Sequence, residues 1–154
     1  MYPGTLSALR MMLAAAVTAL ALPALALAAG QAMSPIASSK LKGSTEVPAK
    51  GDPDGTGLVV VTFSTTKGTA CWKFKGVTKI GKATAAHIHK GRKGVAGPVT
   101  IPFGATYKAS GCAKAAKKVI EAIETNPNNY YVNIHNAKYP GGALRGQLVV
   151  GMEG

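Results

Sequence analysis

The chain contains Thr84-Ala85-Ala86-His87-Ile88-His89 and, further on, Tyr130-Tyr131-Val132-Asn133-Ile134-His135. Both stretches have the length and composition of short strands. Side chains of a strand point alternately to its two faces, so His87 and His89 share one face and Ile88 lies on the other. Strands with this pattern can build a metal site, and they can equally present an ordinary polar sheet face.

Working outward from these stretches, further strand-like runs are separated by turns rich in Gly, Pro, Asp and Asn. They are Leu58 to Phe63, Ala70 to Phe74, Val99 to Phe103 and Leu144 to Val150. In the second run, Ala70, Trp72 and Phe74 should share one face, which we expect to be buried. Many short strands with a single helix predict a mainly β fold, an antiparallel Greek-key-like β-sandwich or barrel with one helical insertion.

The helical insertion is predicted from apolar residues that recur at three- and four-residue spacing: Cys112, Ala115, Ala116, Val119, Ile120 and Ile123. This spacing places them on one face of a helix. Asn126-Pro127 should end the helix, because the residue before proline avoids the α region. The polar residues expected to face outward are Lys114, Lys117, Lys118, Glu121 and Glu124.

The first 28 residues have the pattern of a signal peptide. Arg10 supplies a positive charge, Met11 to Ala26 is apolar, and Ala26-Leu27-Ala28 provides small residues for cleavage after Ala28. The alternative is an uncleaved membrane anchor. We predict a signal peptide over residues 1–28, a flexible lead-in over 29–39 and one domain over 40–150, exported to the periplasm or the extracellular space without a remaining transmembrane span.

Export changes the interpretation of the two cysteines, Cys71 and Cys112. Two thiols in an oxidising compartment usually pair, so we expect a disulfide between them. The alternative is that the thiolates bind a metal, but neither cysteine has a second cysteine or a histidine at ligand-like spacing.

The charge balance is strongly basic, with 18 Lys and Arg against 6 Asp and Glu. An anionic surface, an acidic polysaccharide or a protein partner could be attracted, and a solvated surface without a dedicated partner remains the alternative. Nucleic acid is not expected, because an exported protein does not meet it and the aromatic residues of a base-stacking platform are missing. The central basic cluster comprises Lys73, Lys75, Lys79, Lys82, Lys90, Arg92 and Lys93.

His87, His89 and His135 are all the histidines of the chain. Three neutral imidazoles from two strands could hold copper or zinc and leave a position open for water. No catalytic residue is predicted. A nucleophile with a base and an orienting carboxylate, a pair of glycosidase carboxylates and a phosphate-binding glycine loop are all missing from the sequence.

A larger set of short motifs follows in order along the chain. The motifs are Glu46-Val47-Pro48, Asp54-Gly55-Thr56-Gly57, Ala86-His87-Ile88-His89, Gly97-Pro98-Val99, Asn126-Pro127, Tyr130 to His135, and Tyr139-Pro140-Gly141-Gly142-Ala143-Leu144-Arg145-Gly146-Gln147-Leu148. Taken together, they resemble the chordin-type domain family, called CHRD, over roughly residues 40–150. The family implies a secreted module without an established general activity. The resemblance therefore implies a non-catalytic binding or structural module whose ligand is unknown.

A weaker similarity links His87, His89, His135 and Arg145 to the order of copper ligands and guiding arginine in copper-zinc superoxide dismutases. The bridging histidine and the later aspartate of those enzymes are absent. The resemblance implies at most a copper-only, dismutase-like site in which Arg145 attracts an anion. Alternatively Arg145 and Asn133 brace loops, Glu46 orients a histidine or pairs with Arg145, and Tyr130, Tyr131 and Tyr139 pack around the histidines.

Overall fold

The computed structural model describes Met1 and residues 36–150, so the predicted signal peptide and most of the predicted lead-in lie outside the described residues. The lead-in prediction is wrong for residues 36–39. They belong to strand β1 (Ile36–Lys42), which pairs antiparallel with β2 over its whole length. The buried positions of β1 include Ala37 and Ser39, which are too small to give a clear strand pattern in the sequence.

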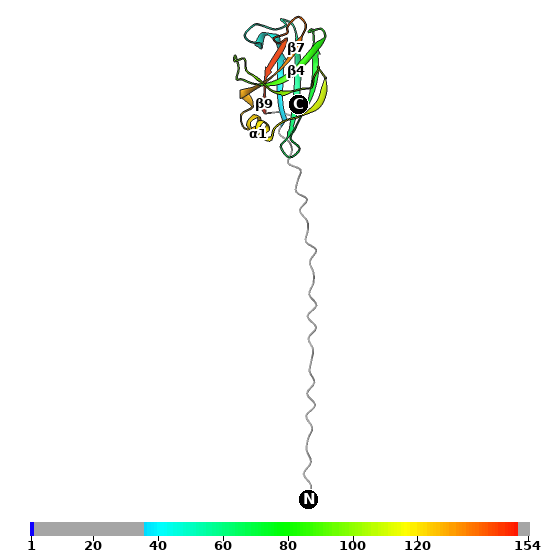
Figure 1. Cartoon of the computed structure of the whole chain (residues 1–154), viewed down its shortest axis with the longest axis vertical. Helices are drawn as coiled ribbons and strands as arrows, with labels where there is room; N and C mark the ends of the chain where they lie inside the picture. Colours follow the sequence, from blue (N-terminus) through cyan, green and yellow to red (C-terminus); the bar gives the residue numbers. More distant parts are fainter. Residues whose placement is uncertain (2–35, 151–154) are drawn as a thin grey trace. The chain divides into compact units, whose positions relative to one another are not determined.

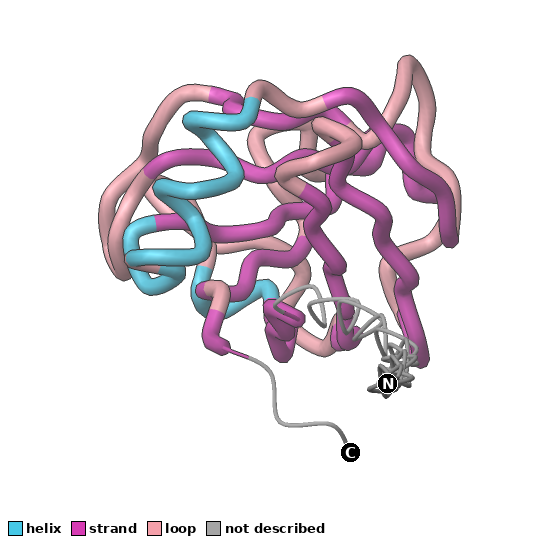
Figure 2. The backbone as a smooth tube through the Cα atoms, turned by 90° about the horizontal axis from the view of Figure 1, so that it is seen from below, coloured by secondary structure: helices cyan, strands magenta, loops and turns pink. Residues whose placement is uncertain are grey.

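The strands form one antiparallel sheet that curls into a nearly closed barrel (Figures 1 and 2), as the predicted fold class requires. Their order around the barrel is β5-β4-β7-β8-β1-β2-β3-β6, and β9 pairs with β1 off this path. The remaining strands are β2 (Thr56–Ser64), β3 (Thr69–Thr78), β4 (Ala83–Lys90), β5 (Val99–Pro102), β6 (Ser110–Lys114), β7 (Tyr130–Asn136), β8 (Leu144–Gln147) and β9 (Val149–Val150).

The segment between β5 and β6 spans the gap between the two ends of the sheet. The Tyr107 N–H donates to the carbonyl of Thr84 on β4, and the Phe74 N–H of β3 donates to the carbonyl of Ala109, both at 2.8 Å. Phe103 stacks on Trp72 with ring centroids 4.4 Å apart. The barrel is therefore closed by loop hydrogen bonds and aromatic packing where strand pairing ends.

The core fills the interior of the barrel with one face of each strand. Ala70, Trp72 and Phe74 are buried, as their alternation predicts. On β4 and β7, Ile88 and Ile134 are completely buried in the core. The side chains that alternate with these isoleucines along β4 and β7 therefore point to the outer face of the sheet.

The single α-helix, α1 (Lys117–Thr125), buries Ile120 and Ile123 and ends before Asn126-Pro127, as predicted. The prediction is wrong in extending the helical pattern back to Cys112, because Cys112 lies in β6. Cys112 lies three residues before Ala115, so it continues the helical spacing although it belongs to the strand. Two short 3-10 helices, Gly43–Thr45 and Pro127–Asn129, complete the structure, and no helix within residues 36–150 is long and apolar enough to span a bilayer.

Cys71 and Cys112 form the predicted disulfide. They lie directly opposite each other on β3 and β6, so the bond fastens the last strand to the sheet. A disulfide agrees with folding in an oxidising compartment.

Replacing both cysteines with alanine should lower the free energy of unfolding by about 4 kcal/mol, because the bond closes a loop across a sequence separation of 41 residues. Urea unfolding of the two proteins measures the difference. A reducing agent should destabilise the wild type and leave the double variant unchanged. Equal unfolding midpoints would contradict the expectation.

Candidate functional site: a three-histidine cluster on the outer face of the barrel

The site occupies the outer face of β4, β7 and β8. The strand register aligns His87 with Asn133 and Asn133 with Arg145, so these three side chains form one row on the same face. The neighbouring row contains His89, Tyr131 and Gln147. Asn133 and Arg145 are each only 2% exposed, which shows that loops cover much of this face. The sheet therefore has a second buried layer, which is polar where the barrel core is apolar.

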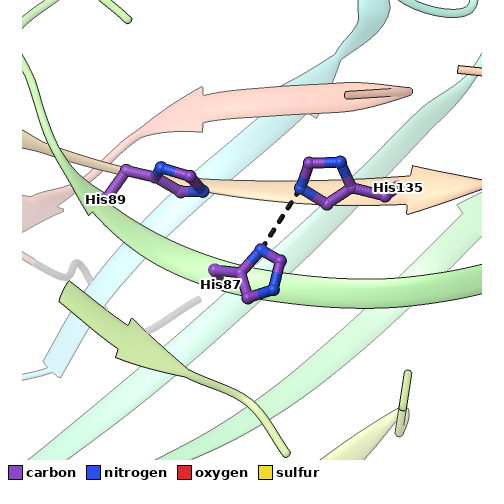
Figure 3. Close-up of side chains that lie close together, drawn as sticks. All are labelled: His87, His89 and His135. Carbon is purple, nitrogen blue, oxygen red and sulfur yellow. Dashed lines mark hydrogen bonds between the residues drawn. The ribbon is translucent and has the colours of Figure 1, made fainter. Parts of the chain in front are cut away.

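The structure brings together all three histidines. One nitrogen of each ring lies within 4.8 Å of the corresponding nitrogens of the other two. His87 Nδ1 is 3.2 Å from His135 Nε2, and His89 completes the cluster from two residues further along β4. Figure 3 shows the three rings with nitrogens turned toward one another. His89 is buried, whereas His87 and His135 are half-buried, so the cluster is open to solvent on the side of the latter two.

Backbone carbonyls fix the orientation and the tautomer of two of the rings. His89 Nδ1 is 2.8 Å from the carbonyl oxygen of Gly97, and His135 Nδ1 is 2.8 Å from that of Pro140. A carbonyl only accepts, so each Nδ1 must carry the proton and each Nε2 has a free lone pair. His87 Nδ1–H then donates to His135 Nε2. The same carbonyl bracing is typical of metal-binding histidines.

Burial lowers the pKa of both His87 and His89, and the nearby charge of His135 lowers each further. The hydrogen bond to the Gly97 carbonyl raises the pKa of His89, but this only partly offsets the lowering by burial. Both rings are therefore neutral at neutral pH, which is the form that binds a metal ion.

Tyr131 lies on β7, the middle strand of the three, and its ring is packed between His89 and Arg145. The rings of His89 and Tyr131 are stacked with centroids 4.8 Å apart, and the Arg145 guanidinium carbon is 3.4 Å from the Tyr131 centroid. Arg145 also donates hydrogen bonds of 3.0 Å to the carbonyls of Arg92 and Val95. Arg145 consequently holds the 91–97 loop over the site, and this same loop supplies the Gly97 carbonyl that braces His89.

Glu46 lies beneath the loop that follows β7. Gly142, with φ +146°, packs directly against the Glu46 carboxyl, so any side chain at Gly142 would collide with it. Burial raises the pKa of Glu46 to about 7, although the Arg145 charge and hydrogen bonds from the Val47 backbone and the Asn133 side chain lower it in part. Glu46 therefore neighbours Arg145 and Asn133 in the polar layer.

Four buried polar side-chain atoms in the described residues lack a hydrogen-bond partner, and all four belong to this polar layer. They are Glu46 Oε1, His89 Nε2, Asn133 Oδ1 and Arg145 Nη1. A buried polar atom without a partner costs about 1 to 3 kcal/mol, so such a group demands an explanation. For His89 Nε2, which faces the other two rings, a bound ion would provide the missing partner.

Sequence reasoning found the three histidines and their polar neighbours, but missed the carbonyls of Gly97 and Pro140. Every residue has a backbone carbonyl, so residue types do not predict which carbonyls bind the histidines. The only sequence signals for these two loops are the motifs that contain Gly97-Pro98 and Pro140-Gly141. Of the three tyrosines expected around the histidines, Tyr131 contacts them, whereas Tyr130 points into the barrel core.

Replacing Glu46 with glutamine should flatten the dependence of stability on pH. In the native protein Glu46 keeps its proton up to about pH 7, whereas the unfolded chain releases it near 4.5. The native state thus binds more protons between these values, and the stabilisation, on the order of 3 kcal/mol, is present below pH 4.5 and lost as the pH rises through about 7. Urea unfolding of both proteins across this range isolates the effect, with the exposed Glu121→Gln as control. A constant difference between wild type and variant would contradict it.

Comparison with known proteins supports the family resemblance. The model of the CHRD domain matches residues 37–148, which include every strand that carries the three-histidine cluster. No curated protein and no solved structure matches the chain. Because the match covers most of the sequence, the chain belongs to the CHRD domain family.

Proposed function

We propose that this CHRD domain is an exported copper-binding module in which His87, His89 and His135 are the ligands. The observation that carries the proposal is the convergence of three ring nitrogens, two of them on rings held by backbone carbonyls. An isolated polar patch does not need rings oriented in this way. A site for a metal ion does, because the lone pairs must point to one position.

The ligand set favours copper. Imidazole nitrogen suits copper, zinc, nickel and iron, and among divalent ions the general order of affinity is highest for Cu²⁺. No thiolate belongs to the set, since both cysteines are in the disulfide, and the cluster contains no carboxylate. Three neutral ligands leave the charge of the ion uncompensated and a coordination position open to solvent.

Binding requires one proton to move. His87 Nδ1 donates to His135 Nε2 in the metal-free protein, so both atoms can act as ligands only after that proton has left. The half-buried His87 ring can carry the proton on Nε2 instead. At neutral pH the site therefore gains a metal by a change of tautomer, without expelling a proton from a charged ring.

The polar layer supports metal binding better than turnover of an anionic substrate. Arg145 is buried, and its hydrogen bonds go to the carbonyls of Arg92 and Val95. This arrangement favours loop bracing over the guiding role that the superoxide dismutase resemblance implies. A copper carrier or storage module fits the geometry without assigning a catalytic residue.

Titration of the disulfide-intact protein with Cu²⁺ should show one tight site. Outer-layer substitutions at metal sites typically cost 10–100-fold in affinity, so removal of a ligand by His87→Ala, His89→Ala or His135→Ala should cost about 100-fold or more. Zn²⁺ should bind the same site more weakly. Couplings specific to imidazole nitrogen in the Cu²⁺ electron paramagnetic resonance spectrum would come from these rings, because the chain has no other histidine.

The triple variant lacking all three histidines provides the background, including any Cu²⁺ bound by the terminal amine. Affinity equal to that background in the wild type would refute the proposal. Retention of tight binding by any single variant would show that the ligand set is different.

Gly97→Ala should weaken Cu²⁺ binding by about tenfold while leaving the three ligands in place. A Cβ atom at Gly97 would overlap the Lys90 carbonyl oxygen, so the loop must move and take the Gly97 carbonyl away from His89. Gly141→Ala is the matched control in the loop on the other side, because a Cβ there meets no atom within 4 Å. Equal affinities of the two variants would show that the carbonyl brace is unimportant.

A further inference from the structure

A second region of the barrel, remote from the histidines in strand order, has an unusual distribution of charge. Among the side chains that the structure describes, those on the outer face of β1, β2, β3 and β6 are basic, small polar or aliphatic, apart from the disulfide. The register aligns Lys40 with Leu58 and Leu58 with Lys75, and the adjacent row aligns Val60 with Lys73. We call this surface the lysine face; its basic residues are Lys40, Lys42, Lys73, Lys75 and Lys114, all exposed.

No acidic side chain of the described residues lies on the lysine face. Glu46 and Asp52 are buried elsewhere. Asp54 is paired with Lys79 and Glu121 with Lys117, and Glu124 is on α1. The ammonium groups of the lysine face therefore repel one another without a counterion from the described chain, and an external anionic surface would neutralise them.

The centre of the lysine face is aliphatic. Leu58 and Val60 are half-buried on the outer side of β2, between the lysine-bearing strands β1 and β3. Lysine stems can extend over such residues while their ammonium groups reach outward. The Cys71–Cys112 disulfide on the same face fastens β6 beside β3. The result is a continuous sheet surface with an apolar centre and a basic surround.

We propose that the lysine face binds the surface of an anionic phospholipid bilayer. Lipid headgroups supply a dense layer of phosphate for the lysines, and the acyl region just below them suits Leu58 and Val60. An acidic polysaccharide would match the charge but not the aliphatic centre. The lysine-face rows also contain no aromatic residue on which a sugar ring could stack.

Sedimentation with lipid vesicles tests the proposal. The protein is used in the form that is purified from the cells that export it. Vesicles of phosphatidylcholine are compared with vesicles that also contain phosphatidylglycerol. A lysine near an anionic membrane contributes about fivefold to binding, so the triple variant Lys40→Gln, Lys73→Gln, Lys75→Gln should bind the anionic vesicles about 100-fold more weakly. An apolar N-terminal segment would bind both kinds of vesicle alike, so the difference between them reports the lysine face.

The matched control removes the same charge elsewhere, with Lys93→Gln, Lys118→Gln and Lys138→Gln, all at exposed positions off the lysine face. It should retain most of the binding. Equal losses in the two triple variants would overturn the proposal, because they would show an effect of net charge alone.

A second pair of variants separates lipid from polysaccharide. Leu58→Thr with Val60→Thr should weaken binding to anionic vesicles and leave binding to soluble dextran sulfate unchanged. If the pair has no effect on vesicle binding, the bilayer is not the partner. Cu²⁺ affinity should be the same in the lysine-face triple variant and in the Leu58 and Val60 variant, so failure of this proposal and failure of the copper proposal would be distinguishable.

Discussion

The antiparallel pairing of β4, β7 and β8 is the constraint on which the site depends. Because side chains alternate along a strand, one register fixes both faces of the sheet at once. Ile88 and Ile134 enter the barrel core only if His87, His89 and His135 point outward together. A slip by one residue would bury the histidines in an apolar core and expose the isoleucines. The hydrophobic core thus holds the three imidazoles in place from the opposite side of the sheet.

The buried polar side chains outside the barrel need hydrogen-bond partners, and backbone groups supply most of these partners. The carbonyls of Arg92, Val95, Gly97 and Pro140 accept bonds from the side chains of the sheet. Carbonyls are fixed by the fold and cannot be protonated near neutral pH, so they hold tautomers better than carboxylates would. The few buried side-chain atoms of the described residues that remain without a hydrogen-bond partner all lie in this layer, and one of them is His89 Nε2.

The sequence predicts the strands and site residues that large or distinctive side chains mark. It does not predict the elements and contacts that depend on small residues or on backbone groups. Alternation of large apolar and polar residues identified β4 and β7, and the type of residue identified the three histidines. The sequence does not predict the first part of β1, because Ala37 and Ser39 are buried yet small. It predicts Cys112 of β6 as part of the helix, because Cys112 continues the spacing of Ala115 and Ala116. The carbonyl braces could not be predicted, since every residue has a carbonyl and only the tertiary fold aims it.

The barrel also explains how one small domain can hold two independent surfaces. The histidines lie on β4 and β7, whereas the lysine face lies on β1, β2, β3 and β6, and β8 separates the two sets in strand order. Charges on the lysine face are in water, where salt screens them over about 8–10 Å at physiological strength. Their field therefore contributes little at His87 and His89, whose pKa values are lowered first by burial. Metal affinity and surface attraction can then vary separately, because each depends on a different set of strands.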